Sequence, residues 1–231
     1  MNSVSLYETA TGRWWLPDSV KTDIVIQAMR AGEIFEPEVV EAVAKYSRPG
    51  STILDVGSNF GQMAILFSRM VGPEGWVHAF EADPFVLELL RRNIAENGAD
   101  HVIVHPGAVW HEPGHSLIYP EPDFSRFGSF GSFGIDPRAT EGRRVESLTI
   151  DSLDIQGDVS VIKIDVQGSD LNAIRGAVQT IQKHKPAIVF EYEVLLQDQF
   201  GTNFSDYERM IADIGYRIDH HFSNNYVILP T

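Results

Sequence analysis

The clearest candidate for chemistry is a glycine-rich turn that follows a buried apolar run. Residues 53–56 read Ile-Leu-Asp-Val, and the turn that follows carries Gly57, Asn59 and Gly61. A helical pattern begins directly after it, at residues 63–69. A strand, a glycine turn and a helix in this order let a ligand approach backbone N–H groups at a helix N-terminus, and glycines leave room for that approach. The sequence therefore predicts a ligand-binding turn.

An acidic residue ends the next predicted strand. Residues 77–80 read Val-His-Ala-Phe, and Glu81 follows them, 26 residues after Asp55. In a strand–helix–strand unit of this kind, an acid at the end of the second strand typically binds the hydroxyl pair of a ribose. The turn and Glu81 together indicate a ligand that contains a nucleoside.

Three interpretations of the turn stay open. The dinucleotide fingerprint G-x-G-x-x-G needs a third glycine, which D-V-G-S-N-F-G lacks. The turn looks more like the loop of Rossmann-like methyltransferases that binds S-adenosyl-L-methionine (SAM), a ligand with no pyrophosphate to neutralise. The third interpretation is an α/β turn with no ligand. The pattern favours SAM.

Composition excludes several other classes of function. The chain has 231 residues and a net charge of −14, and a field of that sign repels nucleic acid and anionic membrane. It has no cysteine, which excludes disulfides, thiolate catalysis and cysteine-based metal sites. Neither a signal peptide nor an apolar run of membrane-spanning length is visible. We therefore expect a cytoplasmic protein.

The elements that must position the turn alternate between strand and helix. Strands are predicted at residues 53–56, 76–80, 102–105, 161–166 and 186–191, and helices at 63–71, 84–97 and 170–182. This alternation predicts a parallel sheet with helices on both faces. A terminal antiparallel hairpin, residues 216–219 with 226–229, would complete a seven-stranded, mostly parallel sheet. The fold class is α/β, with a Rossmann-like core.

Two helices are predicted before this core. Residues 1–12 are polar, and we expect them to be frayed. Asp18 or Ser19 could cap a helix over residues 20–30, which Gly32 would end, and Pro37 starts a second helix. Between them and the polar start, residues 14–17 read Trp-Trp-Leu-Pro, which fits either a flap packed on the core or a wall of a substrate pocket.

The alternation of strands and helices stops between residues 106 and 149. Residues 117–119 and 145–148 are candidates for short strands, and a Phe-Gly-Ser repeat lies between them at residues 127–134. One interpretation of the repeat is a flexible surface loop. The other is a lid with glycine hinges, since exposed phenylalanines would have nowhere to bury their rings.

Taken together, these segments resemble the FkbM-type family of SAM-dependent methyltransferases. The resemblance covers the chain from about residue 16 onwards and rests on the order and spacing of segments 36–38, 53–61, 79–84, 93–98, 162–168, 174–177 and 186–191. The family usually has Glu in the turn after the fourth strand, where this chain has Gln167. The segment 127–134 also departs from the family pattern.

The resemblance implies an activity and a domain organisation. It implies O-methylation of a small-molecule hydroxyl, on a sugar or secondary metabolite, with SAM as cofactor. Residues 1–48 would form an N-terminal extension with two helices packed on the core. Residues 49–231 would form the SAM-binding methyltransferase domain, with an insertion or lid at about 110–145. We expect no nucleic acid or membrane partner, and the sequence leaves the oligomeric state open, with a homodimer among the options.

The resemblance also implies roles for individual residues. Asp55, Gly57, Asn59 and Gly61 would hold the methionine end of SAM, and Glu81 the ribose. The adenine would lie along Ala82, Ala108 and Val109, although no acid follows the third strand to bind its amine.

Transfer of a methyl group to a hydroxyl needs a base. Asp165 and Glu191, at the ends of the fourth and fifth strands, are the first candidates, with Glu193 and His111 behind them. Asp165 could instead anchor the α-ammonium of SAM, or hold Mg²⁺ together with Glu191. No metal site is expected. Two other classes of function stay open: a non-catalytic SAM-binding module and an NAD(P)-dependent oxidoreductase.

Overall fold

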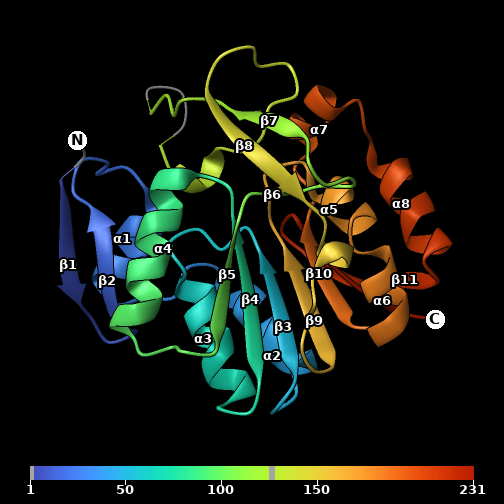
Figure 1. The fold of residues 1–231 in the computed structure, drawn as a ribbon, viewed down its shortest axis with the longest axis horizontal. Coiled ribbons are helices and arrows are strands. Elements are labelled where there is room, and N and C mark those ends of the chain that lie inside the picture. The colour runs from blue at the N-terminus through green and yellow to red at the C-terminus, as the bar shows by residue number, and fades with distance from the viewer. Residues whose placement is uncertain (1–2, 125–127) are drawn as a thin grey trace.

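A mostly parallel sheet organises the molecule, for which a computed structural model describes residues 3–124 and 128–231. Within these residues the main sheet has seven strands in the order β11-β12-β10-β9-β3-β4-β5 (Figure 1). Neighbouring strands are parallel except at β12, which runs antiparallel to both β10 and β11. The strands are β3 (Thr52–Val56), β4 (Trp76–Glu81), β5 (Val102–Pro106), β9 (Val159–Ile164), β10 (Ala187–Glu191), β11 (Tyr216–Phe222) and β12 (Asn225–Pro230). The predicted fold class and terminal hairpin are confirmed.

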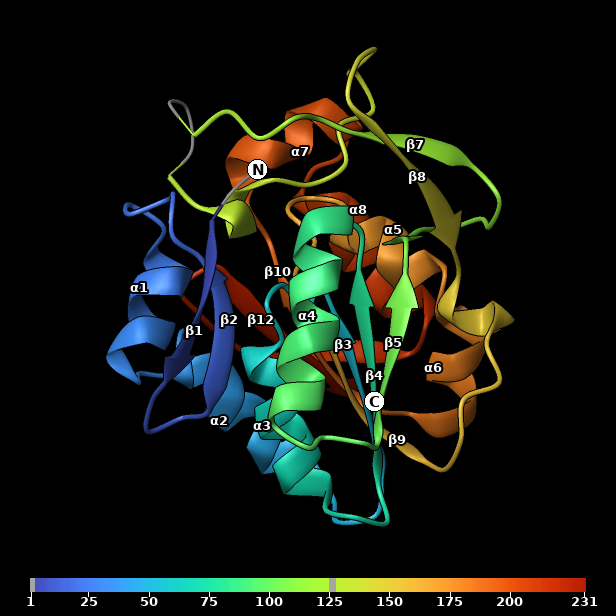
Figure 2. The same cartoon turned by 60° about the vertical axis from the view of Figure 1, so that its left-hand side comes forward.

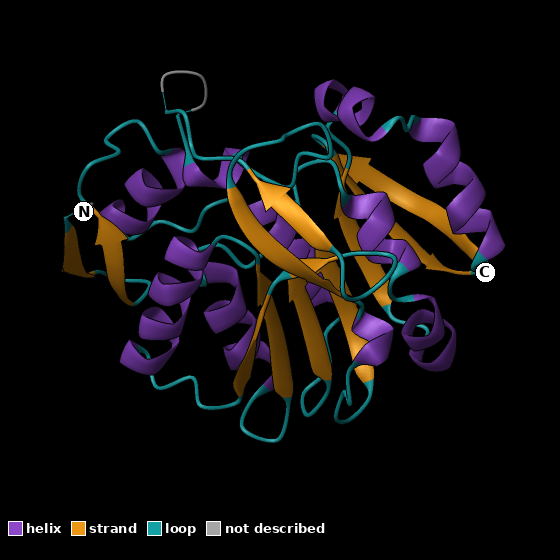
Figure 3. Ribbon diagram, turned by 45° about the horizontal axis from the view of Figure 1, so that its top comes forward, coloured by secondary structure: helices purple, strands orange, loops and turns teal. Residues whose placement is uncertain are grey.

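Helices cover both faces of the main sheet (Figure 3). One face packs against α1 (Ile24–Ala31), α2 (Pro37–Tyr46), α3 (Gln62–Val71) and α4 (Pro84–Glu96). The other face packs against α5 (Asp170–Arg175), α6 (Val178–His184) and α8 (Phe204–Asp213), and α7 (Val194–Phe200) follows β10. Because the central strands are buried on both faces, they are almost continuously apolar. No helix in the described part of the chain is both long and apolar enough to cross a membrane.

Capping and close contacts correct two predicted helix boundaries. The first helix begins at Ile24 and not at residue 20, because the Asp23 carboxylate accepts the N–H of Ile26 at 2.9 Å. Asp18 does not cap it and accepts hydroxyl hydrogen bonds from the N-terminal strand. The helix predicted at 170–182 is broken at Gly176, where a Cβ would lie 2.0 Å from the carbonyl oxygen of Trp110.

The prediction that residues 1–12 are frayed is wrong for the described residues from 3 onwards, and residues 1 and 2 lie outside them. β1 (Val4–Glu8) and β2 (Arg13–Pro17) pair as an antiparallel hairpin. Trp14 and Leu16 are fully buried in the core that α1 to α4 share. The tryptophan segment is therefore part of the core, as one of the two interpretations held, and Trp14 and Trp15 are not among the residues that line the cavity described below.

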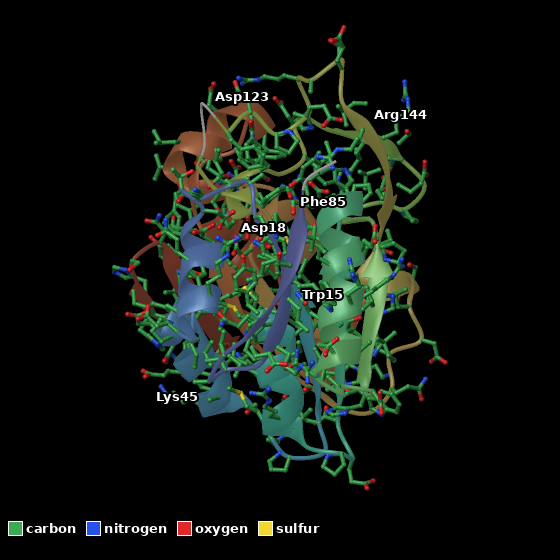
Figure 4. All side chains as sticks on the ribbon, turned by 90° about the vertical axis from the view of Figure 1, so that its left-hand side faces the viewer. Trp15, Asp18, Lys45, Phe85, Asp123 and Arg144 are labelled. Carbon is green, nitrogen blue, oxygen red and sulfur yellow. The ribbon has the colours of Figure 1, made fainter. Side chains whose placement is uncertain are left out.

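A single buried side chain fastens this hairpin to α4. Asn93 accepts the backbone N–H of Trp15 at 2.6 Å, and its amide donates to the carbonyl oxygens of Trp15 and Phe60 at 3.3 and 2.8 Å. The indole of Trp15 lies between the hairpin and α4 (Figure 4), and the guanidinium of Arg92 stacks on it at 4.1 Å. Asn93 thus connects the hairpin, α4 and the turn after β3.

A small second sheet lies above the carboxyl ends of β4 and β5 (Figure 2). β8 (Arg143–Leu148) pairs in parallel with β6 (Ala108–Val109) and antiparallel with β7 (Ser116–Tyr119). The two short strands predicted at 117–119 and 145–148 are confirmed. The single 3₁₀ turns η1 (Phe130–Ser132) and η2 (Ile150–Ser152) flank β8 along the chain.

Replacing Asn93 with alanine should destabilise the fold by about 2–3 kcal/mol, because it leaves buried backbone groups without partners. Asn97→Ala is the matched control: Asn97 makes the same two hydrogen bonds to Arg13, but at a partly exposed site. We expect it to cost less than about 1 kcal/mol. Urea unfolding of both variants measures the difference, and equal losses would contradict the role given to Asn93.

Candidate active site

A cavity of about 260 Å³ opens at the carboxyl end of the main sheet. It lies where the chain switches direction across the sheet, between β3 and β9, which is where α/β folds bind ligands. Residues 129–135 form part of its wall. Eight of the residues predicted for the site line it: Gly57, Asn59, Glu81, Ala82, Ala108, Val109, Asp165 and Glu191. Asp55 and Gly61 do not belong to the lining.

The turn after β3 is shaped by a close approach of two strand ends. Gly57 has φ +84°, and a Cβ on it would lie 1.8 Å from the carbonyl oxygen of Asp165. The N–H groups of Gly57 and Ser58 donate to the carbonyl oxygen of Phe80, at 3.0 and 2.9 Å. Gly57 is therefore required by the backbone itself. Asn59 also has a positive φ, +50°, which is uncommon for a residue with a side chain and often marks a functional site.

Asp55 and Gly61 support the turn from below. The carboxylate of Asp55 is fully buried and lies 3.4 Å from the ammonium of Lys163, which in turn donates to the carbonyl oxygen of Gly57 at 2.9 Å. Gly61 caps α3 with φ +88°, and a Cβ there would lie 2.5 Å from a methyl group of Leu90. Both residues therefore contact the elements that hold the turn, and their role in binding SAM stays a prediction.

Glu81 connects the two strand ends that border the cavity. Its carboxylate accepts the backbone N–H of Asn59 at 2.9 Å and that of Asp83 at 2.8 Å. Burial raises the pKa of Glu81 to about 7, against the opposing effect of these hydrogen bonds. The carboxylate lines the cavity with acceptor capacity to spare, since it has two oxygens and each accepts more than one hydrogen bond.

An apolar compartment adjoins Glu81. Ala82, Ala108 and Val109 line it together with Phe80 and the ring of Tyr119, whose hydroxyl donates to the carbonyl oxygen of Phe133 at 2.8 Å. A flat aromatic ring could pack between these side chains.

The opposite wall concentrates acidic groups around one cation. Lys163 lies 3.7 Å from Asp165 as well as 3.4 Å from Asp55. Burial alone would lower the pKa of Lys163, but these carboxylates raise it above its ordinary value. Burial, with the nearby charges of Asp165 and Asp170, raises the pKa of Glu191 to about 10. Glu191 therefore carries a proton at neutral pH.

Among the lining residues that were missed from the sequence, three lie within the acidic wall. In the sequence, Glu36 is recognised only as part of a helix start. In the structure it lines the cavity with a φ of +48°, and burial together with the charge of Asp165 raises its pKa to about 7. Lys163 reads as one polar residue within a buried strand, which could have been a signal because a buried lysine needs a partner. Gln167, recognised only as a departure from the family pattern, donates to Asp165 at 2.9 Å and to Glu191 at 3.2 Å.

Of the two secondary candidates for the general base, one lines the cavity and the other does not. Glu193 lines the cavity. His111 is not part of the lining, and its ring nitrogen lies 3.1 Å from the side-chain oxygen of Asn172. No group of three or more His, Asp and Glu side chains in the described chain is arranged to hold a metal ion.

Residues 128–135, the roof segment, fold over the cavity. Phe130 is buried against the rings of Phe60, Phe85 and Phe124, with centroids 4.7–5.7 Å apart. The carboxylate of Asp23, which also caps α1, accepts the N–H of Phe130 at 2.7 Å. The segment thus covers part of the cavity, and its role as a lid stays a prediction. Its opening stays a prediction, and Phe127 lies outside the described residues.

The raised pKa of Glu191 should make stability fall with pH. An acid whose pKa is higher in the folded state binds a proton there that the unfolded chain has released, so stability declines from about pH 5 towards pH 10. We expect the melting temperature to fall between pH 7 and 9 and the slope to decrease in Glu191→Gln. Glu193→Gln removes a charge from the same wall and serves as control. A slope that Glu191→Gln leaves unchanged would show that Glu191 is ionised.

Comparison with known proteins agrees with this geometry. The profile of the FkbM methyltransferase domain matches residues 55–218, well over half of the chain. A hexuronic acid methyltransferase of Haloferax volcanii is 25% identical over 158 residues, 67% of this chain and 61% of that protein. An arsenite methyltransferase of Halobacterium salinarum is 37% identical over 65 residues, 28% of this chain and 17% of that protein. The chain thus spans less than two thirds of the length of either relative.

Solved structures show the same fold. An FkbM methyltransferase from Methylobacillus flagellatus superposes with a TM-score of 0.51 at 20% identity, covering 82% of this chain and 50% of the other. A SAM-dependent O-methyltransferase from Thermotoga maritima gives 0.52 at 16% identity, covering 94% and 72%. The chain belongs to the FkbM family of methyltransferase domains, and S-adenosyl-L-methionine is the cofactor that this membership implies.

Proposed function

We propose that the chain transfers the methyl group of SAM to a hydroxyl oxygen of a small molecule, a sugar or a secondary metabolite. The observation that carries the proposal is the position of Asp165. Its carboxylate lies on the cavity wall at the end of β9, beside a buried lysine and a protonated glutamic acid.

The cavity suits a cationic nucleoside ligand. Its described wall holds Glu36, Glu81, Asp165, Glu191 and Glu193, but Lys163 as the single Lys or Arg. This excess of acid favours a ligand with positive charge, and SAM carries a sulfonium and an ammonium. Gly57 and Asn59 would hold its methionine end, Glu81 the ribose, and Ala82, Ala108 and Val109 the adenine. Asp55 and Gly61 would act through the turn that they support.

The chain's own residues would then handle the acceptor. Bound SAM supplies an electrophilic methyl group on a positively charged sulfur. Asp165, whose carboxylate lies 3.7 Å from the ammonium of Lys163, would accept the proton of the acceptor hydroxyl as the methyl group passes from sulfur to oxygen. Glu191 would keep its proton and donate a hydrogen bond. The roof segment would exclude water and hold the acceptor in line with the methyl group.

The acidic wall also bears on the kind of acceptor. A net charge of −14 and carboxyl groups around the cavity oppose the approach of a nucleic acid. The Haloferax relative, by its name, acts on a sugar acid, which supports a sugar here. A neutral sugar suits this wall better than an acidic one, because Lys163 is already paired with two carboxylates.

Asp165→Asn should lower turnover by about 10²–10⁴-fold, the usual loss when a general base is removed. Asn keeps the size of the side chain but cannot accept a proton at neutral pH. Turnover is measured as release of S-adenosylhomocysteine, and SAM affinity by calorimetry. If Asp165 anchors the SAM ammonium instead, affinity falls together with rate. If it binds Mg²⁺, EDTA abolishes wild-type activity. Wild-type values for both quantities would remove Asp165 from the mechanism.

Glu81→Gln should weaken SAM binding by about 1–3 kcal/mol, because one of the two carboxylate acceptors becomes a donor. The amide keeps the shape of the side chain but retains only one of the two backbone hydrogen bonds, so the melting temperature without ligand should fall by less than in Glu81→Ala, and affinity is measured where the variant is folded. Glu81→Ala would be less informative, since it also removes the partners of Asn59 and Asp83. SAM affinity equal to that of the wild type would show that Glu81 does not bind the ribose.

A further inference from the structure

Gln167 connects the two carboxyl groups that the proposed chemistry uses. Its side-chain nitrogen donates to Asp165 at 2.9 Å and to Glu191 at 3.2 Å. An ionised carboxylate only accepts hydrogen bonds, so the nitrogen end of the amide must face Asp165. The charge of Asp165 also contributes to the raised pKa of Glu191. Asp165, Gln167 and Glu191 thus form a connected group in the cavity wall.

The backbone at Gln167 is held in an unusual conformation from two sides. Gln167 has φ +53° and Gly168 has φ +91°, so two left-handed residues follow each other between β9 and α5. A Cβ on Gly134 of the roof segment would lie 3.0 Å from the Cβ of Gln167. A Cβ on Gly168 would lie 2.7 Å from the Cβ of Leu196 in α7. The roof and α7 therefore enclose the turn and fix the direction of the Gln167 side chain.

The charges around this group explain why an amide is suited to the position. Four carboxyl groups from different elements act on Asp165 and Glu191: those of Glu36 at the start of α2, Asp55 on β3, Asp170 on α5 and Glu193 before α7. The ammonium group of Lys163 on β9 opposes their charge. A glutamate at position 167 would add a further negative charge, and Lys163, the one Lys or Arg in the described lining, is already paired with two carboxylates. Glutamine instead supplies N–H donors without charge.

We propose that Gln167 is a positioning residue whose amide holds Asp165 and Glu191 as a pair, and that this position requires a neutral N–H donor. The catalytic meaning of the pair rests on the function proposed above, whereas the arrangement of the three side chains does not. With the donor in place, both carboxyl groups have a hydrogen-bond partner in the amide. Without it, the charged form of the pair loses hydrogen bonds that stabilise it, so the pair should take up a proton more readily.

The test is a titration of the pair in the full chain without ligand. Carbon-13 NMR of labelled Asp and Glu carboxyl carbons follows the two midpoints of the pair, assigned with Asp165→Asn and Glu191→Gln. In Gln167→Met, which has similar volume and no donor, we expect both midpoints to rise by roughly one pH unit. In Gln167→Glu, which keeps the shape, the added carboxyl should raise them as well. Melting curves establish that both variants are folded.

The outcomes separate the two proposals. Midpoints equal to those of the wild type in either folded variant would overturn the role of Gln167, even if Asp165→Asn proved inactive. Raised midpoints would support it, even if Asp165→Asn kept full turnover and the proposed general base were wrong. A merely structural glutamine would change the melting temperature and leave the midpoints where they are.

Discussion

The ammonium group of Lys163 is the interaction on which the site depends. It lies fully within the protein, between the carboxylates of Asp55 and Asp165, and donates to the backbone of the glycine turn. One cation therefore connects the end of β3 to the end of β9 at the point where the chain changes direction across the sheet. A buried charge is tolerated only when it is paired, so Lys163 and its two acids stabilise each other and fix the turn at the same time.

Much of the core could be predicted from the sequence, because its signals are local. The apolar run before Gly57, the Asp83-Pro84 start of α4 and the spacing to Glu81 each follow from neighbouring residues, and the structure has each of them as expected. The same reasoning placed eight of ten candidate residues on the cavity wall. Asp55 and Gly61 were placed in the right turn, but whether a residue of that turn lines the cavity depends on the packing of distant elements.

The missed features depend on contacts between segments far apart in the chain. The N-terminal hairpin reads as a polar tail until Trp14 is placed in the core. At the break between α5 and α6, the carbonyl group of Trp110, more than sixty residues away in sequence, leaves room only for a glycine at position 176. Glu36 joins the site only because a left-handed residue turns the chain at the start of α2. No period or motif within a short window records such contacts, and they determine the shape of the cavity more than its position.

The attachment of the hairpin through Asn93 has a consequence for synthesis on the ribosome. Trp15 of β2 cannot bind Asn93 until α4, some eighty residues later, has left the exit tunnel. The hairpin must therefore wait while α1 to α3 appear, with the indole of Trp14 and the side chain of Leu16 exposed to solvent or to a chaperone. Contacts this distant slow folding, and the interval is when a nascent chain is most open to aggregation. The hairpin is thus translated before α1 to α4 but becomes fixed only after them.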